Sequence, residues 1–274
     1  MKLHNGRLTI AANLCGEPLY KRGFKQQALG AAAPLPEHHA AAAYYWAHNI
    51  FHSPIEHPDT VHIPFAGTGT LGIETLSLML GACPGSHSDR HFLVSNFNQT
   101  PVSTMEFIRK RNRTAGVSSA IQSTRENVES FVASVAAKQT GSEGGKRSTV
   151  LCTFDTMDFL APGASNRALV GGEGGKLHHH CVLLNPPFGK RLDTSVSPVE
   201  TYRQLSRAVQ AMRYSSNNKT VRKDIKVSGY CLCPDEATWK AFSSNKFANL
   251  FSCKTRHFTH GGIDMRVIAF TSKA

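Results

Sequence analysis

From residue 61 onward, short apolar runs alternate with longer segments of helical periodicity, and this alternation restricts the fold more than any other feature. The apolar runs predict strands and the longer segments predict helices. The expected strands cover residues 61–65, 91–95, 149–154, 181–184 and 226–231, and the expected helices cover residues 71–80, 101–114, 122–138, 198–212 and 235–247. Repeated strand–helix units predict an α/β fold with a mostly parallel sheet that helices cover on both faces.

The end of the chain has a different pattern. Two further apolar runs, 251–258 and 265–271, follow each other without a helix between them, and Gly261 and Gly262 lie in the connection. A glycine pair between two strands favours a tight hairpin turn. We therefore expect a C-terminal hairpin that adds one antiparallel strand to the sheet.

The first 50 residues form a separate stretch. Residues 3–14 predict a strand or a hairpin arm, residues 16–25 a basic loop, and the following Ala-rich segment a helix that ends at about Trp46. Because this stretch is too small to bury a core of its own, we expect residues 1–50 to be a lead-in packed on a domain of residues 51–274.

Two Gly-rich polar segments, 141–148 and 171–176, interrupt the alternation of strands and helices. Their composition is typical of flexible insertions. Neither segment lies between a strand and a helix as a phosphate-binding loop does, so we assign them no function.

The charge of the chain points to a polyanionic partner. The sequence has 31 Lys and Arg residues against 19 Asp and Glu residues, which gives a net charge of +12. Contacts from Lys and Arg to phosphates are the main source of affinity for nucleic acids, so RNA or DNA is the expected partner. No apolar run is long enough to cross a bilayer, and no membrane partner is expected.

The seven cysteines are odd in number and scattered along the chain, which favours reduced thiols in an intracellular protein. No signal peptide is apparent, and the cytoplasm and the mitochondrion both remain open as compartments. His178-His179-His180 directly precede an apolar run. We expect them to end a loop rather than to bind a metal, and no metal is expected elsewhere.

A glycine-rich turn follows the first expected strand of the core, with the sequence Ile63-Pro64-Phe65-Ala66-Gly67-Thr68-Gly69-Thr70. Glycines allow a sharp turn and a close approach of the backbone to a ligand. The helix that follows offers N–H groups at its N-terminus to an anionic group, as in nucleotide-binding sheets. A tight turn without a ligand explains the same residues. The candidate cofactor-binding residues are Pro64, Ala66, Gly67, Thr68, Gly69 and Thr70.

A second loop, Asn185-Pro186-Pro187-Phe188, follows the apolar run 181–184. Two prolines make this loop stiff. The Asn185 amide oxygen and a loop carbonyl could accept from an exocyclic amino group, which orients its nitrogen for methyl transfer. Phe188 offers a ring on which a base can stack. The alternative is a proline-rich turn with a buried phenylalanine.

Two more polar residues end expected strands. Asp158, with Asp155 as a local rival, could accept from the adenine amino group of a nucleotide cofactor, although a helix cap explains it equally well. Asn98 and Asn96 stand where cofactor-binding sheets usually place an acid that binds ribose hydroxyls.

Four segments together resemble the catalytic domain of THUMP-associated rRNA guanine-N2 methyltransferases, a family that modifies bacterial large-subunit rRNA. These are residues 13–24, 33–43, 64–74 and 185–193. The likeness spans most of the chain. It implies a Rossmann-like class I fold, with S-adenosylmethionine (SAM) as the cofactor and a guanine N2 in rRNA as the acceptor.

The resemblance also implies site residues. The turn 66–70, Asn98 and Asp158 would bind SAM, and the loop 185–188 would hold the acceptor base. Two family acids are replaced here, by Ile63 and by Asn98. The THUMP domain has no counterpart in these residues, so a separate RNA-binding module or partner protein is an expected partner. Both a fragment and a shortened protein remain open.

The two replaced acids leave a second function open, a weakly active or inactive methyltransferase-like factor that binds RNA during ribosome assembly. A third function keeps the enzyme but changes the acceptor. Loops of the Asn-Pro-Pro-aromatic type also serve adenine-N6 methylation.

Overall fold

The computed structural model describes the following residues of the chain: 2–11, 16, 18, 20–22, 35–52, 56–67, 69–79, 93, 101–104, 106–107, 159–160, 177–186, 196–214, 220–260 and 263–273. The chain divides into two compact units. The first comprises Met1–His38 and Thr68–Cys152, and the second His39–Gly67 and Thr153–Ala274. The lead-in of residues 1–50 and the core of residues 51–274 stay a prediction.

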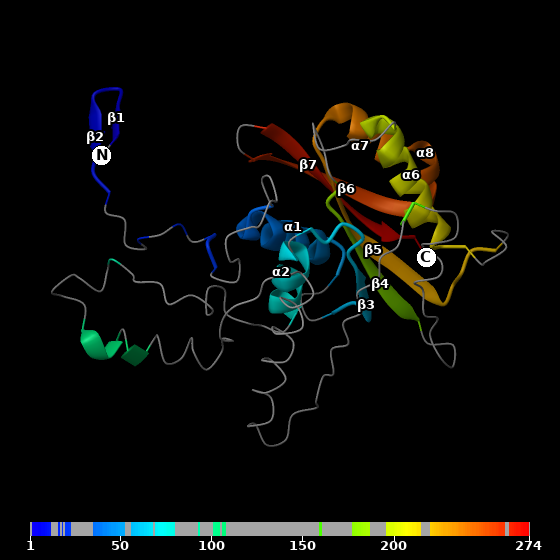
Figure 1. The fold of residues 1–274 in the computed structure, drawn as a ribbon, viewed down its shortest axis with the longest axis horizontal. Coiled ribbons are helices and arrows are strands. Elements are labelled where there is room, and N and C mark those ends of the chain that lie inside the picture. The colour runs from blue at the N-terminus through cyan, green and yellow to red at the C-terminus, as the bar shows by residue number, and fades with distance from the viewer. Residues whose placement is uncertain are drawn as a thin grey trace, which may run out of the picture. The chain divides into compact units, whose positions relative to one another are not determined.

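The first unit begins with a small hairpin of β1 (Lys2–His4) and β2 (Arg7–Thr9) (Figure 1). Asn5 and Gly6 form its turn with φ angles of 48° and 71°, as a two-residue hairpin turn of type I′ requires. The unit also contains α2 (Thr70–Met79), which begins one residue before the expected helix 71–80. Both elements agree with the sequence analysis.

The second unit contains a five-stranded sheet in the order β3-β4-β5-β7-β6 (Figure 1). Strands β3, β4 and β5 are parallel, and β7 runs antiparallel between β5 and β6. The expected C-terminal hairpin with one antiparallel strand is therefore confirmed. The strand bounds are β3 (Thr60–His62), β4 (His178–Leu184), β5 (Ile225–Cys233), β6 (Phe251–His260) and β7 (Ile263–Ser272).

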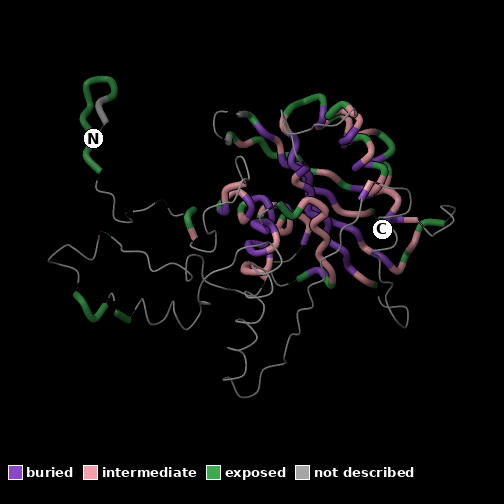
Figure 2. The backbone as a smooth tube through the Cα atoms, viewed as in Figure 1, coloured by how far each residue is buried: buried purple, intermediate pink, exposed green. Residues whose placement is uncertain are grey.

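The sheet is covered by helices on both faces. Helices α6 (Pro198–Ala211), α7 (Glu236–Phe242) and α8 (Asn245–Leu250) contribute to one apolar core with Val182 and Leu184 of β4. In Figure 2 the tube is mainly buried along the central strands, whereas α6 is buried on one side only. Helix α1 (Glu37–Asn49) buries Tyr44 near Cys181, and the side chain of Cys181 points to the other face because strand residues alternate.

The sequence predicts one helix over residues 235–247, and this prediction is wrong. Two helices cover the region, because the Ser244 hydroxyl accepts from the Phe247 N–H at 3.4 Å and starts a new helix. The Ser243 hydroxyl donates to the Trp239 carbonyl at 2.8 Å and closes the preceding one. Serine favours both roles because its hydroxyl competes for backbone groups.

Several expected elements lie outside the described residues. They include the helix 122–138 and the strands 91–95 and 149–154, apart from Leu93. Of the expected helix 101–114, residues 102–104 and 106–107 are described and are helical. None of the described helices combines the length and the hydropathy that crossing a bilayer requires.

Candidate active site

The candidate site lies where the parallel strands β3 and β4 end. Thr60 pairs with His180 and His62 with Val182, so the two strands run side by side in the same direction. The turn after β3 and the loop after β4 therefore begin at the same edge of the sheet, which we call the carboxyl edge. In open α/β sheets this edge is where ligands bind.

The turn after β3 leaves the sheet early. The strand was expected to reach Phe65, but it ends at His62, because Pro64 has no N–H to donate to the neighbouring strand. Gly67 is exposed and has a φ of 55°, and a Cβ there would meet no atom within 4 Å. The backbone conformation, not lack of space, therefore favours glycine at this position.

The turn continues into α2 in the first unit. Thr68 lies outside the described residues, and Gly69 has a φ of 80°. The Gly69 carbonyl accepts from the Ile73 N–H at 3.0 Å, so Gly69 occupies the cap position before the helix. Thr70 is the first helical residue and is buried. The strand–turn–helix arrangement that the sequence predicts is therefore present.

The loop after β4 begins with Asn185 and Pro186, of which Pro186 is buried. The amide oxygen Oδ1 of Asn185 is also buried, and it has no hydrogen-bond partner in the described part of the chain. A buried acceptor without a partner costs about 1–3 kcal/mol, so such atoms are rare unless they serve a function. Pro187 and Phe188 lie outside the described residues.

Two other candidates, Asn98 and Asp158, also lie outside the described residues. The residue after Asp158 is described. Phe159 is 7% exposed and packs in the same apolar core as Val182 and Leu184. The roles of Asn98 and Asp158 stay predictions.

An ion pair in the first unit was not anticipated from the sequence. Arg22 Nε lies 3.1 Å from Glu74 Oε1, and the two side chains are 12% and 3% exposed. Both residues belong to segments that carry the family resemblance, 13–24 and 64–74. A single acid in the otherwise apolar helix 71–80 is the signal that could have indicated a buried partner.

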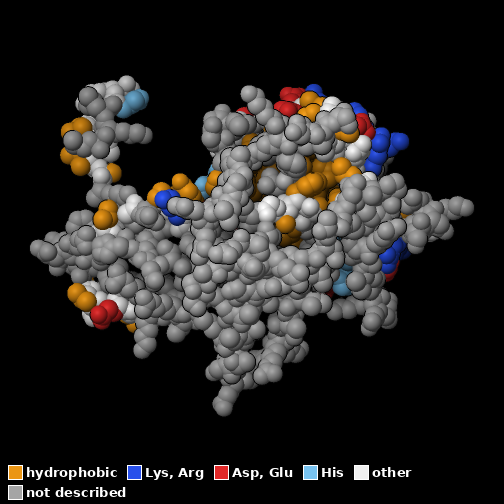
Figure 3. All heavy atoms as spheres, viewed as in Figure 1, with side chains coloured by type: hydrophobic (Ala, Val, Ile, Leu, Met, Phe, Trp, Pro, Cys, Tyr) orange, Lys and Arg blue, Asp and Glu red, His pale blue; other side chains and the backbone are white. Residues whose placement is uncertain are grey.

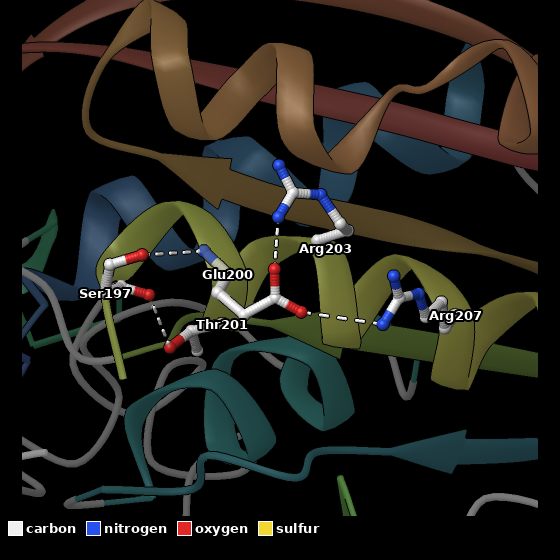
Figure 4. A network of polar contacts seen from close by, with 5 residues as sticks. All are labelled: Ser197, Glu200, Thr201, Arg203 and Arg207. Carbon is white, nitrogen blue, oxygen red and sulfur yellow. Dashed lines mark hydrogen bonds and ion pairs between the residues drawn. The ribbon is translucent and has the colours of Figure 1, made fainter. Parts of the chain in front are cut away.

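The first turns of α6 carry a network of polar contacts (Figure 4). The Ser197 hydroxyl accepts from the Glu200 N–H at 3.3 Å and caps the helix. The Glu200 carboxylate in turn accepts from Arg203 and lies 3.5 Å from Nη1 of Arg207. These contacts fix the start of α6.

The three histidines before the acceptor loop belong to β4, which corrects the expectation that they end a loop. His178 Nε2 lies 3.0 Å from the Thr60 hydroxyl and His180 Nδ1 lies 2.9 Å from His62 Nε2. His179 Nε2 lies 2.7 Å from the Ser228 hydroxyl. These partners explain how polar rings occupy a mostly buried strand.

Burial keeps the rings of His62 and His179 neutral. It lowers the pKa of His62 to about 4 and that of His179 to about 3, and neighbouring His and Lys side chains add to the effect. No group of three or more His, Cys, Asp or Glu residues in the described ranges has the arrangement of a metal site. That the protein binds no metal stays a prediction.

Comparison with known proteins identifies relatives of this chain. A curated protein of Shewanella amazonensis is 28% identical over 206 residues, which cover 73% of this chain and 26% of the relative. One of Hahella chejuensis is 30% identical over 216 residues, covering 74% of this chain and 27% of the relative. Both are named ribosomal RNA large subunit methyltransferase K/L.

The homologues of this chain are ribosomal RNA large subunit methyltransferases. The resemblance inferred from the sequence is thereby confirmed. The chain spans about a quarter of the length of these relatives, given shares of 26% and 27%. No family model matches it.

Solved structures show the same fold. SMU.472, provisionally assigned as a methyltransferase and complexed with SAH, has a TM-score of 0.58 at 16% identity over 95% of this chain and 58% of that chain. A predicted N6-adenine-specific DNA methylase from Listeria monocytogenes has a TM-score of 0.52 at 17% identity over 92% of this chain and 55% of that chain. The α/β, Rossmann-like fold of class I SAM-dependent methyltransferases is thereby confirmed.

Proposed function

We propose that this chain is a SAM-dependent RNA methyltransferase that transfers a methyl group to the exocyclic N2 of a guanine in rRNA. The observation that carries the proposal is the buried Asn185 Oδ1, which lacks a partner among the described residues. It stands directly after β4, at the carboxyl edge beside the turn that follows β3. The names and the matched segments of the homologues support the same reaction.

The role of Asn185 follows from its chemistry. An amide oxygen is a hydrogen-bond acceptor, so Oδ1 can accept one N–H of the guanine amino group and orient the nitrogen lone pair toward the methyl carbon. The N–C bond forms as the C–S bond of the sulfonium breaks, and the nitrogen then releases a proton to water. Pro186 and Pro187 would restrain the loop, and Phe188 would stack on the base.

The residues of the turn fit a cofactor of this kind. When bound, SAM supplies a methyl group that is activated by its positive sulfur. Ala66 and Gly67 are exposed at the carboxyl edge, and no side chain at Gly67 obstructs the backbone. We propose that Pro64, Ala66, Gly67, Thr68, Gly69 and Thr70 hold the cofactor together with Asn98 and Asp158.

The decisive experiment measures methyl transfer from labelled SAM to rRNA and identifies the modified nucleoside after digestion. We expect N2-methylguanosine, and we expect Asn185→Ala to slow transfer by about 100-fold or more, as loss of one positioned polar group does elsewhere. Asn249→Ala is the matched control, because Asn249 is exposed on α8. The proposal is wrong if the wild-type chain transfers no methyl group to any RNA.

Ile63 favours a second function. It follows β3 directly as a half-buried apolar residue where the homologous family has an acid, so the site lacks one charged partner. A chain with a site weakened in this way could act as an RNA-binding factor in ribosome assembly. Calorimetric titration with SAM separates the two functions, because only the enzyme requires cofactor binding.

The acceptor could also be adenine N6, as the name of the Listeria neighbour suggests for that protein. The nucleoside analysis decides this question directly. We further propose that a separate RNA-binding module or partner protein assists the chain, because the homologous segment is about a quarter of each relative, 26% and 27%.

A further inference from the structure

One edge strand of the sheet, β6, carries a row of two cations and an aromatic ring. Among the described strands, β6 pairs with β7 alone. Because β7 is antiparallel to both β5 and β6, strand β6 runs in the same direction as β4. The C-terminal end of β6 therefore lies at the carboxyl edge, where Asn185 also lies.

Alternate residues of β6 share a face of the sheet. Lys254 and Arg256 lie on one face and are both exposed. Phe258 comes next on that face and is half-buried, with its ring centroid 5.4 Å from that of His39 on α1. Two cations followed by an aromatic ring thus form a row that leads toward the carboxyl edge.

The two cations of the row have no carboxylate partner in the described part of the chain. Three other exposed cations of the second unit do have one. Arg203 and Arg207 share Glu200, and Lys240 lies 2.8 Å from Glu236. Figure 3 shows such acidic and basic side chains next to one another where Figure 1 shows α7. The charge of Lys254 and Arg256 therefore remains available for an external anion.

We propose that Lys254 and Arg256 bind successive phosphates of the RNA that flanks the target base. This inference rests on the proposed function, because it assumes an RNA substrate. Residues two apart on a strand are spaced by about 6.6 Å, which is comparable to the separation of neighbouring phosphates along one nucleic acid strand. A partner with regularly spaced negative charges fits this row better than a single anion does.

The row positions RNA rather than the reacting base. Three strand spacings separate β6 from β4, which places the row about 14 Å from the strand that precedes Asn185. A flexible RNA strand can cover that distance over a few nucleotides. Lys254 and Arg256 are thus positioning residues, and their loss should weaken RNA binding without affecting the cofactor.

The test compares the double variant Lys254→Gln/Arg256→Gln with the wild-type chain. Binding of a labelled rRNA fragment is followed by fluorescence anisotropy over a series of KCl concentrations. We expect affinity to fall about 10-fold or more, and the slope of log affinity against log salt to decrease by about 1.4–1.8 for two phosphate contacts. SAM affinity should remain unchanged.

Two control variants make the result specific. Arg203→Gln/Arg207→Gln removes the same charge from a pair that Glu200 partly neutralises, and it should change the slope less. Lys254→Arg/Arg256→Lys keeps the charge and should retain the wild-type slope. Equal slopes for the two Gln variants would overturn the proposal.

The result is distinguishable from failure of the proposed function. A wild-type chain that binds RNA through this row but transfers no methyl group would refute the proposed enzymatic function and support the proposed RNA-binding row. A chain that methylates rRNA equally well, with the same salt slope, in the wild type and in Lys254→Gln/Arg256→Gln would refute the surface and keep the enzyme.

Discussion

The two ends of β4 differ in whether the buried polar groups there have hydrogen-bond partners. At its amino end, His178, His179 and His180 all have ring nitrogens within hydrogen-bond distance of another side chain, at 2.7–3.0 Å. At its carboxyl end, the buried Oδ1 of Asn185 has no such partner among the described residues. A satisfied polar cluster thus lies at the start of this seven-residue strand, and an unsatisfied acceptor follows directly after its end.

This difference separates a structural role from a functional one. A buried polar group that is hydrogen-bonded contributes to stability, and removing its partner costs about 1–3 kcal/mol. An acceptor that lacks a partner contributes no such stability, so the fold does not explain its presence. We therefore expect substitutions at the amino end to change stability, and substitutions at the carboxyl end to change activity.

The largest expected effect on stability comes from a substitution in β5 that disturbs its pairing with β4. Gly229 of β5 pairs with Val182 of β4 and has a φ of 149°, and a Cβ there would lie 2.8 Å from the Val182 carbonyl carbon and closer still to its oxygen. Gly229→Ala should therefore lower the free energy of unfolding by about 4 kcal/mol or more, since backbone cannot move aside.

Chemical denaturation followed by circular dichroism measures this effect. Gly67→Ala is the matched control, because its Cβ would meet no atom within 4 Å and only the φ of 55° is unfavourable. Gly67→Ala should lower the free energy of unfolding by about 1–2 kcal/mol. Equal losses in the two variants would contradict the close approach of β4 and β5.

The second prediction uses pH to destabilise the histidine cluster near the amino end of β4. Burial lowers the pKa of His52 and His62 to about 4 and that of His179 to about 3, below the usual 6.5. As pH falls below about 6.5, the unfolded chain takes up protons that the folded chain does not, so stability decreases with falling pH. Above about pH 6.5 this stability is fully present.

Each proton taken up only by the unfolded chain costs about 1.4 kcal/mol per pH unit. Allowing for solvent screening, we expect the free energy of unfolding to fall by about 3 kcal/mol between pH 7 and pH 5, as measured by denaturant titration at each pH. Replacement of His179 by Gln should reduce the slope, whereas His257→Gln, at an exposed position on β6, should not. A flat profile across this range would show that the rings are not buried and neutral.

The third prediction concerns a single ring of the amino end. His179→Ala leaves the Ser228 hydroxyl without its 2.7 Å partner and removes a side chain that packs against His52 at 4.8 Å between ring centroids. Stability should fall by about 2 kcal/mol. The rate of methyl transfer by the folded variant should stay at the wild-type value, and a large decrease would place this ring in the site.

The sequence predicts one end of β4 well and the other poorly, for a physical reason. Four apolar residues predict the buried part of the strand, and the loop 185–188 follows them directly. The histidines were assigned to a loop because polar residues seldom start a buried strand. Their partners Thr60 and His62 lie 118 residues away in sequence, so no local pattern could reveal them.

Two further features that the sequence does not reveal have a local and a long-range cause. The break between α7 and α8 depends on the Ser243 hydroxyl donating and the Ser244 hydroxyl accepting a hydrogen bond, whereas the apolar pattern of 235–247 continues across it. The pair Arg22–Glu74 joins segments 52 residues apart. The turn after β3 is predictable because glycine permits the positive φ angles found at Gly67 and Gly69.

The smallest expected effect on stability belongs to the carboxyl end. Asn185→Ala removes a buried acceptor that makes no hydrogen bond in the described part of the chain, so the free energy of unfolding should not fall and should rise by up to about 1 kcal/mol. Ser206→Ala is the comparison, because its buried hydroxyl donates to the Phe242 carbonyl at 2.7 Å and its loss should cost about 1–2 kcal/mol. Denaturant midpoints of the two variants measure the difference. If Asn185→Ala destabilised the chain as much as Ser206→Ala, Asn185 would be a structural residue like the histidines of the amino end, and its buried oxygen would no longer indicate an acceptor site.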